Sequence, residues 1–427
     1  MKPFLLTTLL LLALNGLAGE MRAWRSRDGS QTLQAQYVAI RDNDTVVLRS
    51  GEKQNHHVPI AKLSPEDQDY LFEAETRKAL GGTAEKIEGL AYRQGEILGP
   101  LEALDGSSFY LYVPKSLAHD RAVPLMLYTG PTGGKMLHIR GLIKGAEVTG
   151  WIVAVVVESD YYNSVDVNRG ICNSVVQTLL DTAPVDPRRL YFAGFSAGAS
   201  VSYYNEKKWK ACGLIPMSTY IPPSLDPPSC DTVIISGGSD FNRYTSAWAR
   251  GQIGAKAVHR FHGEGHKTAP PWMMHEAMAL LETRGLQSNP YTHPQEKNRF
   301  IYSMIDWIDE FKDKEPHRAY YWVRMLKDTF RLNILQRAKL DPLFEQLNQS
   351  EQNRLYVNGL DALDRLSLSF LSTVTRESRL NYTDDALTVA CIPLLQTYQH
   401  TPVIKDALLA LCTPTDEPAC VQPHWEE

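Results

Sequence analysis

The sequence predicts an α/β protein with a mostly parallel sheet, a small N-terminal β-rich domain and a C-terminal helical domain. Between about residues 95 and 285, short apolar runs alternate with helix-prone stretches, as in strands joined by crossover helices. After Gly285 the apolar residues recur every three or four positions with almost no strand signal, which indicates helices. A chain of 427 residues also exceeds what one hydrophobic core usually fills, so we expect more than one domain.

The composition is that of a soluble globular protein, with 43% hydrophobic and 22% charged residues. The formal net charge of −5 gives no electrostatic reason to bind nucleic acid, which usually requires a clearly basic face. We therefore expect no nucleic-acid partner.

The first residues have the pattern of an export signal. Lys2 supplies a positive charge, Phe4–Leu14 is apolar apart from two threonines, and Gly16-Leu17-Ala18 offers small residues for cleavage. The apolar run is shorter than the roughly 20 residues that a membrane-spanning helix needs. The sequence thus predicts a signal peptide over residues 1–19 and a secreted or periplasmic protein that keeps no membrane span after cleavage.

Residues 20–75 are predicted to form a small β-barrel. The runs 32–40, 45–48 and 57–60 are typical of short strands. Ser64 is suited to cap a helix, because Pro65 fits the first helical position and Asp67 stands where a capping-box acid would. The charged, helix-prone residues 76–94 then form a linker helix.

Residues 22–71 resemble the SHD1-type, SH3-like module that is attached to many exported bacterial proteins. The residues that carry this resemblance are Trp24, Val47, Val58-Pro59, Leu63-Ser64 and Asp67-Gln68. The resemblance implies an interaction or spacer role, with a protein or a surface as partner, and no chemistry.

Strand-like runs follow one another in the central domain, for which we expect residues 95–290. They cover residues 109–113, 124–128, 151–157, 189–193 and 232–236. Two of them, at 151–157 and 233–235, are apolar throughout, as expected for strands that are covered on both faces.

The strongest chemical signal is Gly194-Phe195-Ser196-Ala197-Gly198. It lies between a predicted buried strand and a predicted helix, where a tight turn lifts the Ser196 hydroxyl above the sheet. Glycines are needed on both sides because larger side chains would collide where strand and helix approach. The sequence therefore predicts Ser196 as a nucleophile, with the Ala197 N–H as one donor to a developing oxyanion.

A serine hydroxyl needs a base that is itself held by an acid. Asp240 follows the strand at 232–236 through a glycine turn, and we predict it as the acid; Asp231, at the other end of that strand, and Glu264 are alternatives. His266 follows Gly263-Glu264-Gly265 and precedes a helix. It is our choice for the base over His259 and His262, which lie in or near the last predicted strand.

A second oxyanion donor is expected from the glycine-rich loop after residues 125–128. Pro131 has no N–H, so Thr132 or Gly130 must supply the donor.

Residues 95–285 resemble the α/β-hydrolase superfamily, nearest to the exported polyhydroxybutyrate depolymerases and the feruloyl and acetylxylan esterases. The matching segments are VDPRRLYFAGFSAGAS, GGSDFNRY and GEGHKTAPPW. The resemblance implies that Ser196, Asp240 and His266 act as nucleophile, acid and base on a carboxylic ester, either a small molecule or a piece of a polymer. Many relatives have His-Gly and then small residues in the oxyanion loop, where this chain has Thr129-Gly130-Pro131.

Two other functions remain open from the sequence: a serine peptidase of the prolyl-oligopeptidase kind, and a non-catalytic scaffold with a hydrolase fold. Neither a cofactor nor a metal site is expected, since no cysteine or histidine spacing is typical of zinc ligands. In an exported protein, Cys212 with Cys230, and Cys412 with Cys391 or Cys420, are candidate disulfides. Residues 291–427 are expected to form a separate helical bundle without a site.

Overall fold

The computed structural model describes residues 21–51, 54–79, 91–115, 117, 122–288, 294–369 and 384–413. The predicted signal peptide, residues 80–90 of the predicted linker and Cys420 lie outside the described residues. The chain divides into two compact units. The first combines residues 1–78 with 323–346, and the second combines residues 79–322 with 347–427.

The first unit contains an antiparallel sheet of four strands in the order β1-β2-β3-β4. The strands are β1 (Met21–Arg25), β2 (Thr32–Arg41), β3 (Thr45–Ser50) and β4 (Gln54–Pro59); η1 (Ile60–Lys62) and α2 (Pro65–Ala79) follow. The sequence predicted β2, β3, β4 and α2 but missed β1. Backbone hydrogen bonds from Arg27 to Lys62 and from Ser64 to Arg25 join the chain after β1 to the chain around η1.

The start of α2 differs in one detail from the expected capping box. The Ser64 hydroxyl accepts a hydrogen bond from the Asp67 N–H at 3.2 Å, as predicted. The buried Asp67 carboxylate instead accepts from the Arg22 guanidinium, at 2.9 and 2.7 Å, and from the Arg25 N–H at 2.6 Å. Asp67 therefore fastens β1 to α2.

The second unit is built on a sheet of eight strands in the order β12-β11-β10-β9-β7-β8-β6-β5. They are β5 (Ile97–Glu102), β6 (Ser108–Tyr112), β7 (Val123–Thr129), β8 (Ile152–Val156), β9 (Val185–Phe195), β10 (Gly213–Met217), β11 (Asp231–Gly237) and β12 (Ala257–His262). The six strands β7 to β12 run parallel to one another, whereas β6 pairs antiparallel with both β5 and β8. This mostly parallel sheet confirms the predicted α/β class and fits an α/β-hydrolase.

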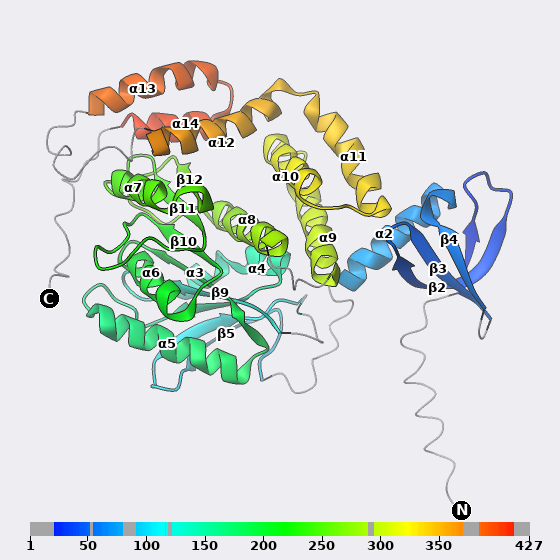
Figure 1. The fold of residues 1–427 in the computed structure, drawn as a ribbon, viewed down its shortest axis with the longest axis horizontal. Coiled ribbons are helices and arrows are strands. Elements are labelled where there is room, and N and C mark those ends of the chain that lie inside the picture. The colour runs from blue at the N-terminus through cyan, green and yellow to red at the C-terminus, as the bar shows by residue number, and fades with distance from the viewer. Residues whose placement is uncertain are drawn as a thin grey trace, which may run out of the picture. The chain divides into compact units, whose positions relative to one another are not determined.

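Helices cover both faces of this sheet (Figure 1). On one face α5 (Val165–Thr182) packs against α6 (Ala197–Trp209), and on the other α4 (Ile143–Thr149) packs against α8 (Pro271–Ser288). Alternate residues of each strand point to each face. Leu125 and Leu127 of β7, for example, share a core cluster with Val175 and Leu179 of α5.

The other helices are α3 (Met136–Arg140), α7 (Arg243–Ile253), η2 (Gly254–Lys256), α9 (Pro294–Phe311), α10 (Pro316–Thr329), α11 (Ile334–Asn348), α12 (Glu351–Ser369), α13 (Asp384–Thr397) and α14 (Pro402–Leu411). The predicted helices after residue 290 are present, but they do not form one separate bundle. Residues 323–346 belong to the first unit, where Leu335 of α11 is buried beside Trp24 and Leu71. Residues 347–413 belong to the second unit, where α12 and α14 pack against β12.

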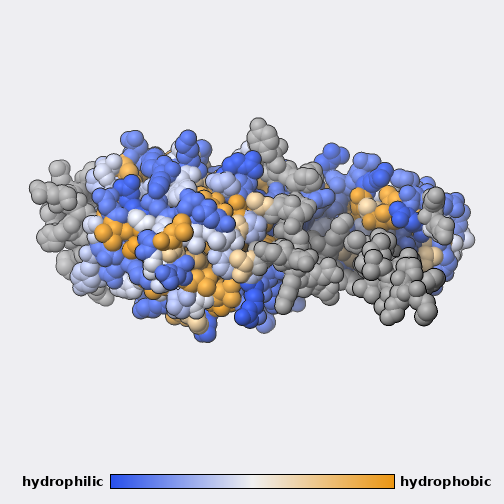
Figure 2. Space-filling model, turned by 90° about the horizontal axis from the view of Figure 1, so that it is seen from below, coloured by the Kyte–Doolittle hydropathy of each residue, from blue (hydrophilic) through white to orange (hydrophobic). Residues whose placement is uncertain are grey.

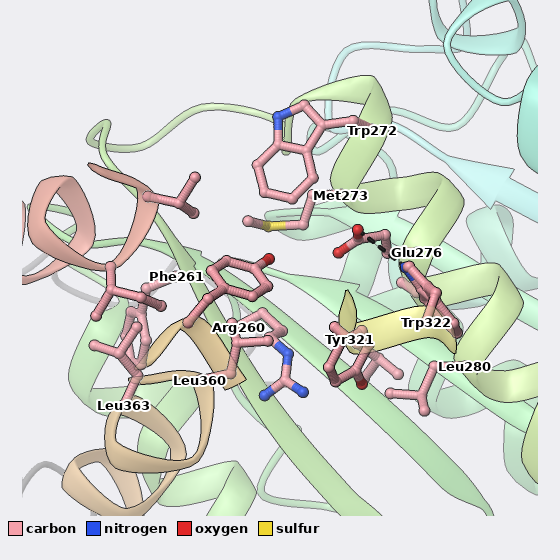
Figure 3. A pocket seen from close by; sticks show the side chains of 15 residues that line it. Arg260, Phe261, Trp272, Met273, Glu276, Leu280, Tyr321, Trp322, Leu360 and Leu363 are labelled. Atoms are coloured by element: carbon pink, nitrogen blue, oxygen red, sulfur yellow. Dashed lines mark hydrogen bonds between the residues drawn. The ribbon is translucent and has the colours of Figure 1, made fainter. Parts of the chain in front are cut away.

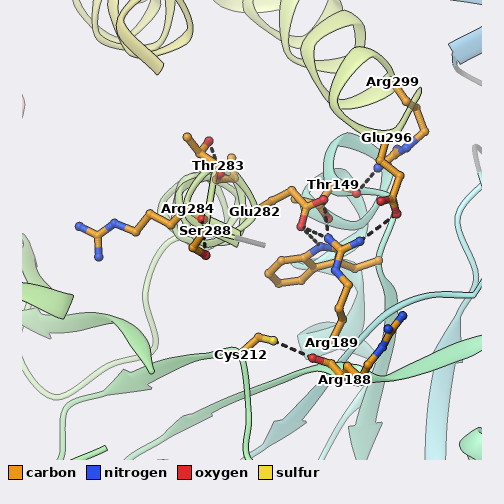
Figure 4. A network of polar contacts seen from close by, with 12 residues as sticks. Thr149, Arg188, Arg189, Cys212, Glu282, Thr283, Arg284, Ser288, Glu296 and Arg299 are labelled. Carbon is orange, nitrogen blue, oxygen red and sulfur yellow. Dashed lines mark hydrogen bonds and ion pairs between the residues drawn. The ribbon is translucent and has the colours of Figure 1, made fainter. Parts of the chain in front are cut away.

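A buried polar network fixes two helices on the sheet of the second unit (Figure 4). Arg189 of β9 donates to both Glu282 oxygens, at 2.9 and 2.7 Å, and to Glu296 of α9 at 2.9 Å; the Trp151 indole also donates to Glu282, at 2.9 Å. A buried charge is tolerated when it is paired and hydrogen-bonded. Both Nη atoms of Arg189 and both carboxylate oxygens of Glu282 are partnered within it, so we regard the network as structural.

The five described cysteines are free thiols. The candidate pair Cys212 and Cys230 is therefore not bonded: the Cys212 thiol donates to the Arg188 carbonyl at 2.8 Å, and Cys230 is buried just before β11. The thiols of Cys391 and Cys412 are hydrogen-bonded to each other, and burial raises the pKa of Cys391 to about 12.

The surface on the face displayed in Figure 2 mixes apolar and polar side chains, which is ordinary for a globular protein. Within the described residues, no helix combines the length and the apolar character that a membrane crossing requires.

Candidate active site

Ser196 occupies a strained turn between β9 and α6. Its backbone has φ 53° and ψ −124°, a conformation that side-chain-bearing residues rarely adopt. The Ser196 N–H donates to the Met217 carbonyl of β10 at 2.9 Å, and its carbonyl accepts from Ala199 at 3.0 Å. These bonds hold the turn, and they place the hydroxyl at the carboxyl end of the sheet.

The flanking glycines have a steric reason. A Cβ on Gly194 would lie 2.6 Å from the Gly198 carbonyl oxygen, and a Cβ on Gly198 would lie 2.4 Å from the Thr129 oxygen. The second contact shows that the start of α6 lies directly against the end of β7. The Thr129 hydroxyl strengthens this junction by donating to the Gly198 carbonyl at 2.6 Å.

The three side chains predicted to act together do lie together. His266 Nε2 is 3.0 Å from Ser196 Oγ. On the other side of the ring, His266 Nδ1 is 3.0 and 3.2 Å from the two Asp240 oxygens. Such a chain requires Nδ1 to carry a proton and Nε2 to accept one, which is the arrangement that lets an imidazole take the proton from a hydroxyl.

Asp240 is held as a charged acceptor. Its side chain is fully buried, and one of its oxygens accepts from the Asn242 N–H at 2.7 Å. Burial alone would raise the pKa of the Asp240 carboxyl, but the hydrogen bond and charge of His266 and the Asn242 N–H together lower it below its usual value. The carboxylate is thus ionised and can stabilise an imidazolium.

Two aromatic rings pack near the imidazole of His266. Its ring centre is 4.8 Å from that of Phe195 and 4.2 Å from that of Phe241. Its side chain is 24% exposed, so one edge remains open to a reactant. The sequence reasoning overlooked both phenylalanines. Phe195 directly precedes Ser196, and Phe241 directly follows Asp240. Their positions next to the predicted site residues could have identified them.

The other two histidines considered as bases are engaged elsewhere. His259 is fully buried, and its ring nitrogens contact Ser367 Oγ at 2.7 Å and Ser236 Oγ at 3.0 Å. Burial lowers the pKa of His259 to about 3. His262 ends β12 and is also buried, and burial lowers its pKa. Neither ring lies on Ser196.

The alternative acids also lie elsewhere. Asp231 pairs with Arg284 at 3.2 Å, at the opposite end of β11 from Asp240. Glu264 pairs with Lys267 at 3.0 Å in an exposed position on the loop before His266. Of the three predicted candidates, Asp240 alone contacts the imidazole of His266.

The loop predicted to hold the second oxyanion donor lies beside Ser196's helix. The Gly130 carbonyl carbon would be 2.9 Å from a Cβ on Gly198. The N–H groups of Gly133 and Gly134 already donate to Ser159 and Val157, at 2.7 and 3.2 Å. In the described turns and loops, the N–H groups of Thr132 and Ala197 make no hydrogen bond to a backbone carbonyl. Both are therefore still candidate donors, with Gly130 as the alternative to Thr132.

Two aromatic side chains lie on the loop next to residues 129–134. Tyr161 and Tyr162 follow β8, are 40% and 82% exposed, and have ring centres 3.9 Å apart. The Tyr161 N–H donates to the Pro131 carbonyl at 2.8 Å, which joins the two loops. Trp272, near the start of α8, faces a separate pocket and packs against the Arg318 guanidinium.

That pocket lies between β12, α8, α10, α12 and α14 (Figure 3). Ser196, Asp240 and His266 do not line it. Its polar groups largely satisfy one another, since Glu276 accepts from Arg318 at 2.8 Å and from Trp322 at 3.1 Å. The rest of its lining is mainly apolar and aromatic, and it is separate from the site at Ser196.

Within the described residues, no group of three or more His, Cys, Asp or Glu side chains is arranged to hold a metal ion. Chemically, the arrangement at Ser196 offers a hydroxyl, a base and a buried acid in one hydrogen-bonded chain, with open N–H groups nearby.

No protein-family model matches the sequence, and no curated protein matches it. Among solved structures, the chain is similar to a thermostable esterase at 17% identity and a TM-score of 0.34, over 40% of this chain and 58% of that one. It is similar to a serine hydrolase without a lid from Xanthomonas campestris at 17% identity and a TM-score of 0.35, over 47% of this chain and 99% of that one. It is also similar to an esterase from Pyrobaculum calidifontis at 11% identity and a TM-score of 0.36, over 51% of this chain and 94% of that one.

Proposed function

We propose that this protein is an exported serine hydrolase of the α/β-hydrolase type that cleaves a carboxylic ester. The observation that carries the proposal is the unbroken hydrogen-bond chain from Ser196 Oγ through His266 to Asp240, with distances of 3.0, 3.0 and 3.2 Å. A strained serine conformation at the start of a helix supports it, because such strain persists where function requires it.

The reaction proceeds through an acyl-enzyme. As Ser196 Oγ attacks the carbonyl carbon, His266 takes the hydroxyl proton, and Asp240 stabilises the imidazolium. The resulting oxyanion accepts hydrogen bonds from the Ala197 N–H and from the N–H of Thr132 or Gly130. His266 then returns the proton to the leaving alcohol, and a water molecule repeats the sequence to release the acid. No cofactor takes part.

The direct test is hydrolysis of nitrophenyl acyl esters by the wild type, Ser196→Ala and Asp240→Asn. We expect Ser196→Ala to lose turnover entirely. Asp240→Asn should lose about 10⁴-fold in kcat because the amide favours the wrong imidazole tautomer. Peptide anilides assayed in parallel separate an esterase from a peptidase. Ester turnover that survives in folded Ser196→Ala would contradict the proposal.

The surroundings of the site leave the substrate class broad. Exposed Tyr161 and Tyr162 beside the oxyanion loop offer an apolar surface to the alcohol or acyl part of an ester.

For the N-terminal unit we propose a role in binding a protein or a surface, which rests on its resemblance to the SH3-like module alone. Analysis of the mature N-terminus after expression with residues 1–19 tests the proposed export.

A further inference from the structure

The loops that carry Asp240 and His266 lie against each other. A Cβ on Gly237 would lie 2.1 Å from the carbonyl oxygens of both Glu264 and Gly265. The Gly238 N–H donates to the His262 carbonyl at 2.8 Å. The position of the acid relative to the base is therefore decided by the backbone from Gly237 to Asp240.

The C-terminal helix α14 packs on the same backbone. A Cβ on Gly238 would lie 2.5 Å from the Ala410 Cβ and 2.9 Å from the Ala407 oxygen and the Leu411 nitrogen. Ala407 and Leu411 are buried. The helix α14 thus packs directly on the segment 237–240, here called the acid loop, with no room for a side chain between them.

One buried cation joins the two. Arg243 begins α7, is 0% exposed, and donates from Nη1 to the Gly238 carbonyl at 2.9 Å and to the Thr413 carbonyl at 3.1 Å. Its backbone N–H also donates to the Asp240 carbonyl at 3.0 Å. Thr413 follows the last turn of α14, where the helix dipole is negative and favours a cation. The guanidinium therefore hydrogen-bonds both the acid loop and the end of α14.

We propose that Arg243 is a positioning residue, which holds the acid loop against α14 and thereby keeps the Asp240 carboxylate aligned with His266. It acts through the Gly238 carbonyl and does not touch the reactants. The inference rests on the proposed function, since alignment matters only if the acid and base work together.

The test compares Arg243→Met, Arg243→Lys and the wild type by ester kinetics and by proton NMR. Methionine keeps an unbranched stem but lacks the guanidinium, so both hydrogen bonds from Nη1 are lost. We therefore expect kcat to fall about 10- to 100-fold, as small misplacements of reacting groups do, with KM nearly unchanged. Lysine can still donate to one carbonyl and should recover part of the loss. The low-field proton of the Asp240–His266 hydrogen bond should shift or disappear in Arg243→Met.

Arg250→Met is the matched control. Arg250 lies on the same helix, is also buried, and pairs with Asp364 at 2.9 Å instead of with the acid loop. It should lose stability but keep the low-field proton. If Arg243→Met does not fold, Gly238→Ala replaces it, because its Cβ must push the acid loop away from α14; it should likewise lose kcat and the low-field signal.

The two hypotheses can fail separately. A wild type without esterase activity that shows the low-field proton, lost in Arg243→Met, would contradict the proposed function and support the positioning role. A folded Arg243→Met with wild-type kcat and an unchanged low-field proton would overturn the positioning role.

Discussion

The Asn242 side chain donates to the Ser218 carbonyl at 2.9 Å, and so ties the acid loop to the end of the neighbouring strand β10. Removing this donor in Asn242→Ala should lower the free energy of unfolding by about 1 kcal/mol, the net value of one hydrogen bond. Urea unfolding measures the change. Gln177→Ala, which alters an exposed contact on α5, should change it by less than about 0.5 kcal/mol. Equal effects of the two substitutions would contradict the role of Asn242.

Gly198→Ala should damage both stability and reaction. The Cβ added at Gly198 would lie 2.4 Å from the carbonyl oxygen of Thr129, so the start of α6 must move away from β7. We expect a loss of about 1–3 kcal/mol, as for other overpacked sites. Because the movement displaces Ser196, kcat should fall about 100-fold.

The control for this substitution is Gly170→Ala in the middle of α5. No atom lies within 4 Å of its Cβ position, so alanine should be neutral or stabilise by up to about 1 kcal/mol. Thermal unfolding of both variants checks the pair. A Gly198→Ala variant as stable and active as the wild type would show that the turn is looser than described.

His259 should make stability depend on pH. Burial lowers its pKa from 6.5 to about 3 in the folded protein. Between these values the unfolded chain binds a proton that the folded protein excludes, so stability rises with pH in this range and falls as the pH drops below 6.5. The free energy of unfolding measured from pH 4 to 7 should have a shallower slope in His259→Gln than in the wild type. Parallel slopes would contradict the burial of a neutral imidazole.

Cys391 and Cys412 are predicted to form a disulfide in an oxidising compartment, because their thiols already touch. Exchange with a small-molecule disulfide would convert the two thiols to one bond and reduce the reagent to two thiols. A loop of this length should stabilise the protein by about 3 kcal/mol. Peptide mapping by mass spectrometry after such treatment checks the pairing. A Cys412–Cys420 linkage, or free thiols throughout, would contradict it.

The sequence predicted the parts of the fold that depend on local pattern. Apolar runs such as Trp151–Val157 identify buried strands, and the glycines around Ser196 identify the tight turn. The strand β10 (Gly213–Met217) was missed because its apolar run is short, begins with a glycine and is interrupted by Pro216. Amphipathic helices after residue 290 were recognisable, but their pattern does not say which surface their apolar faces cover. For this reason the sequence did not predict that Leu335 packs in the core of the N-terminal unit.

The site was predictable to a similar extent. Order along the chain and position after strands selected Ser196, Asp240 and His266 from their competitors. The support of the acid loop was not predictable, because Arg243 acts on Gly238 and on Thr413, which lies 170 positions away. For the second oxyanion donor the sequence offered both Thr132 and Gly130, because Pro131, which lies between them, has no N–H.

Covalent labelling with a fluorophosphonate tests the central claim most directly, because the reagent needs an activated serine but no particular substrate. We predict that the folded wild type gains one label on the peptide that contains Ser196, and that Ser196→Ala gains none. A folded wild type that stays unlabelled, or a label that persists in Ser196→Ala, would contradict the account.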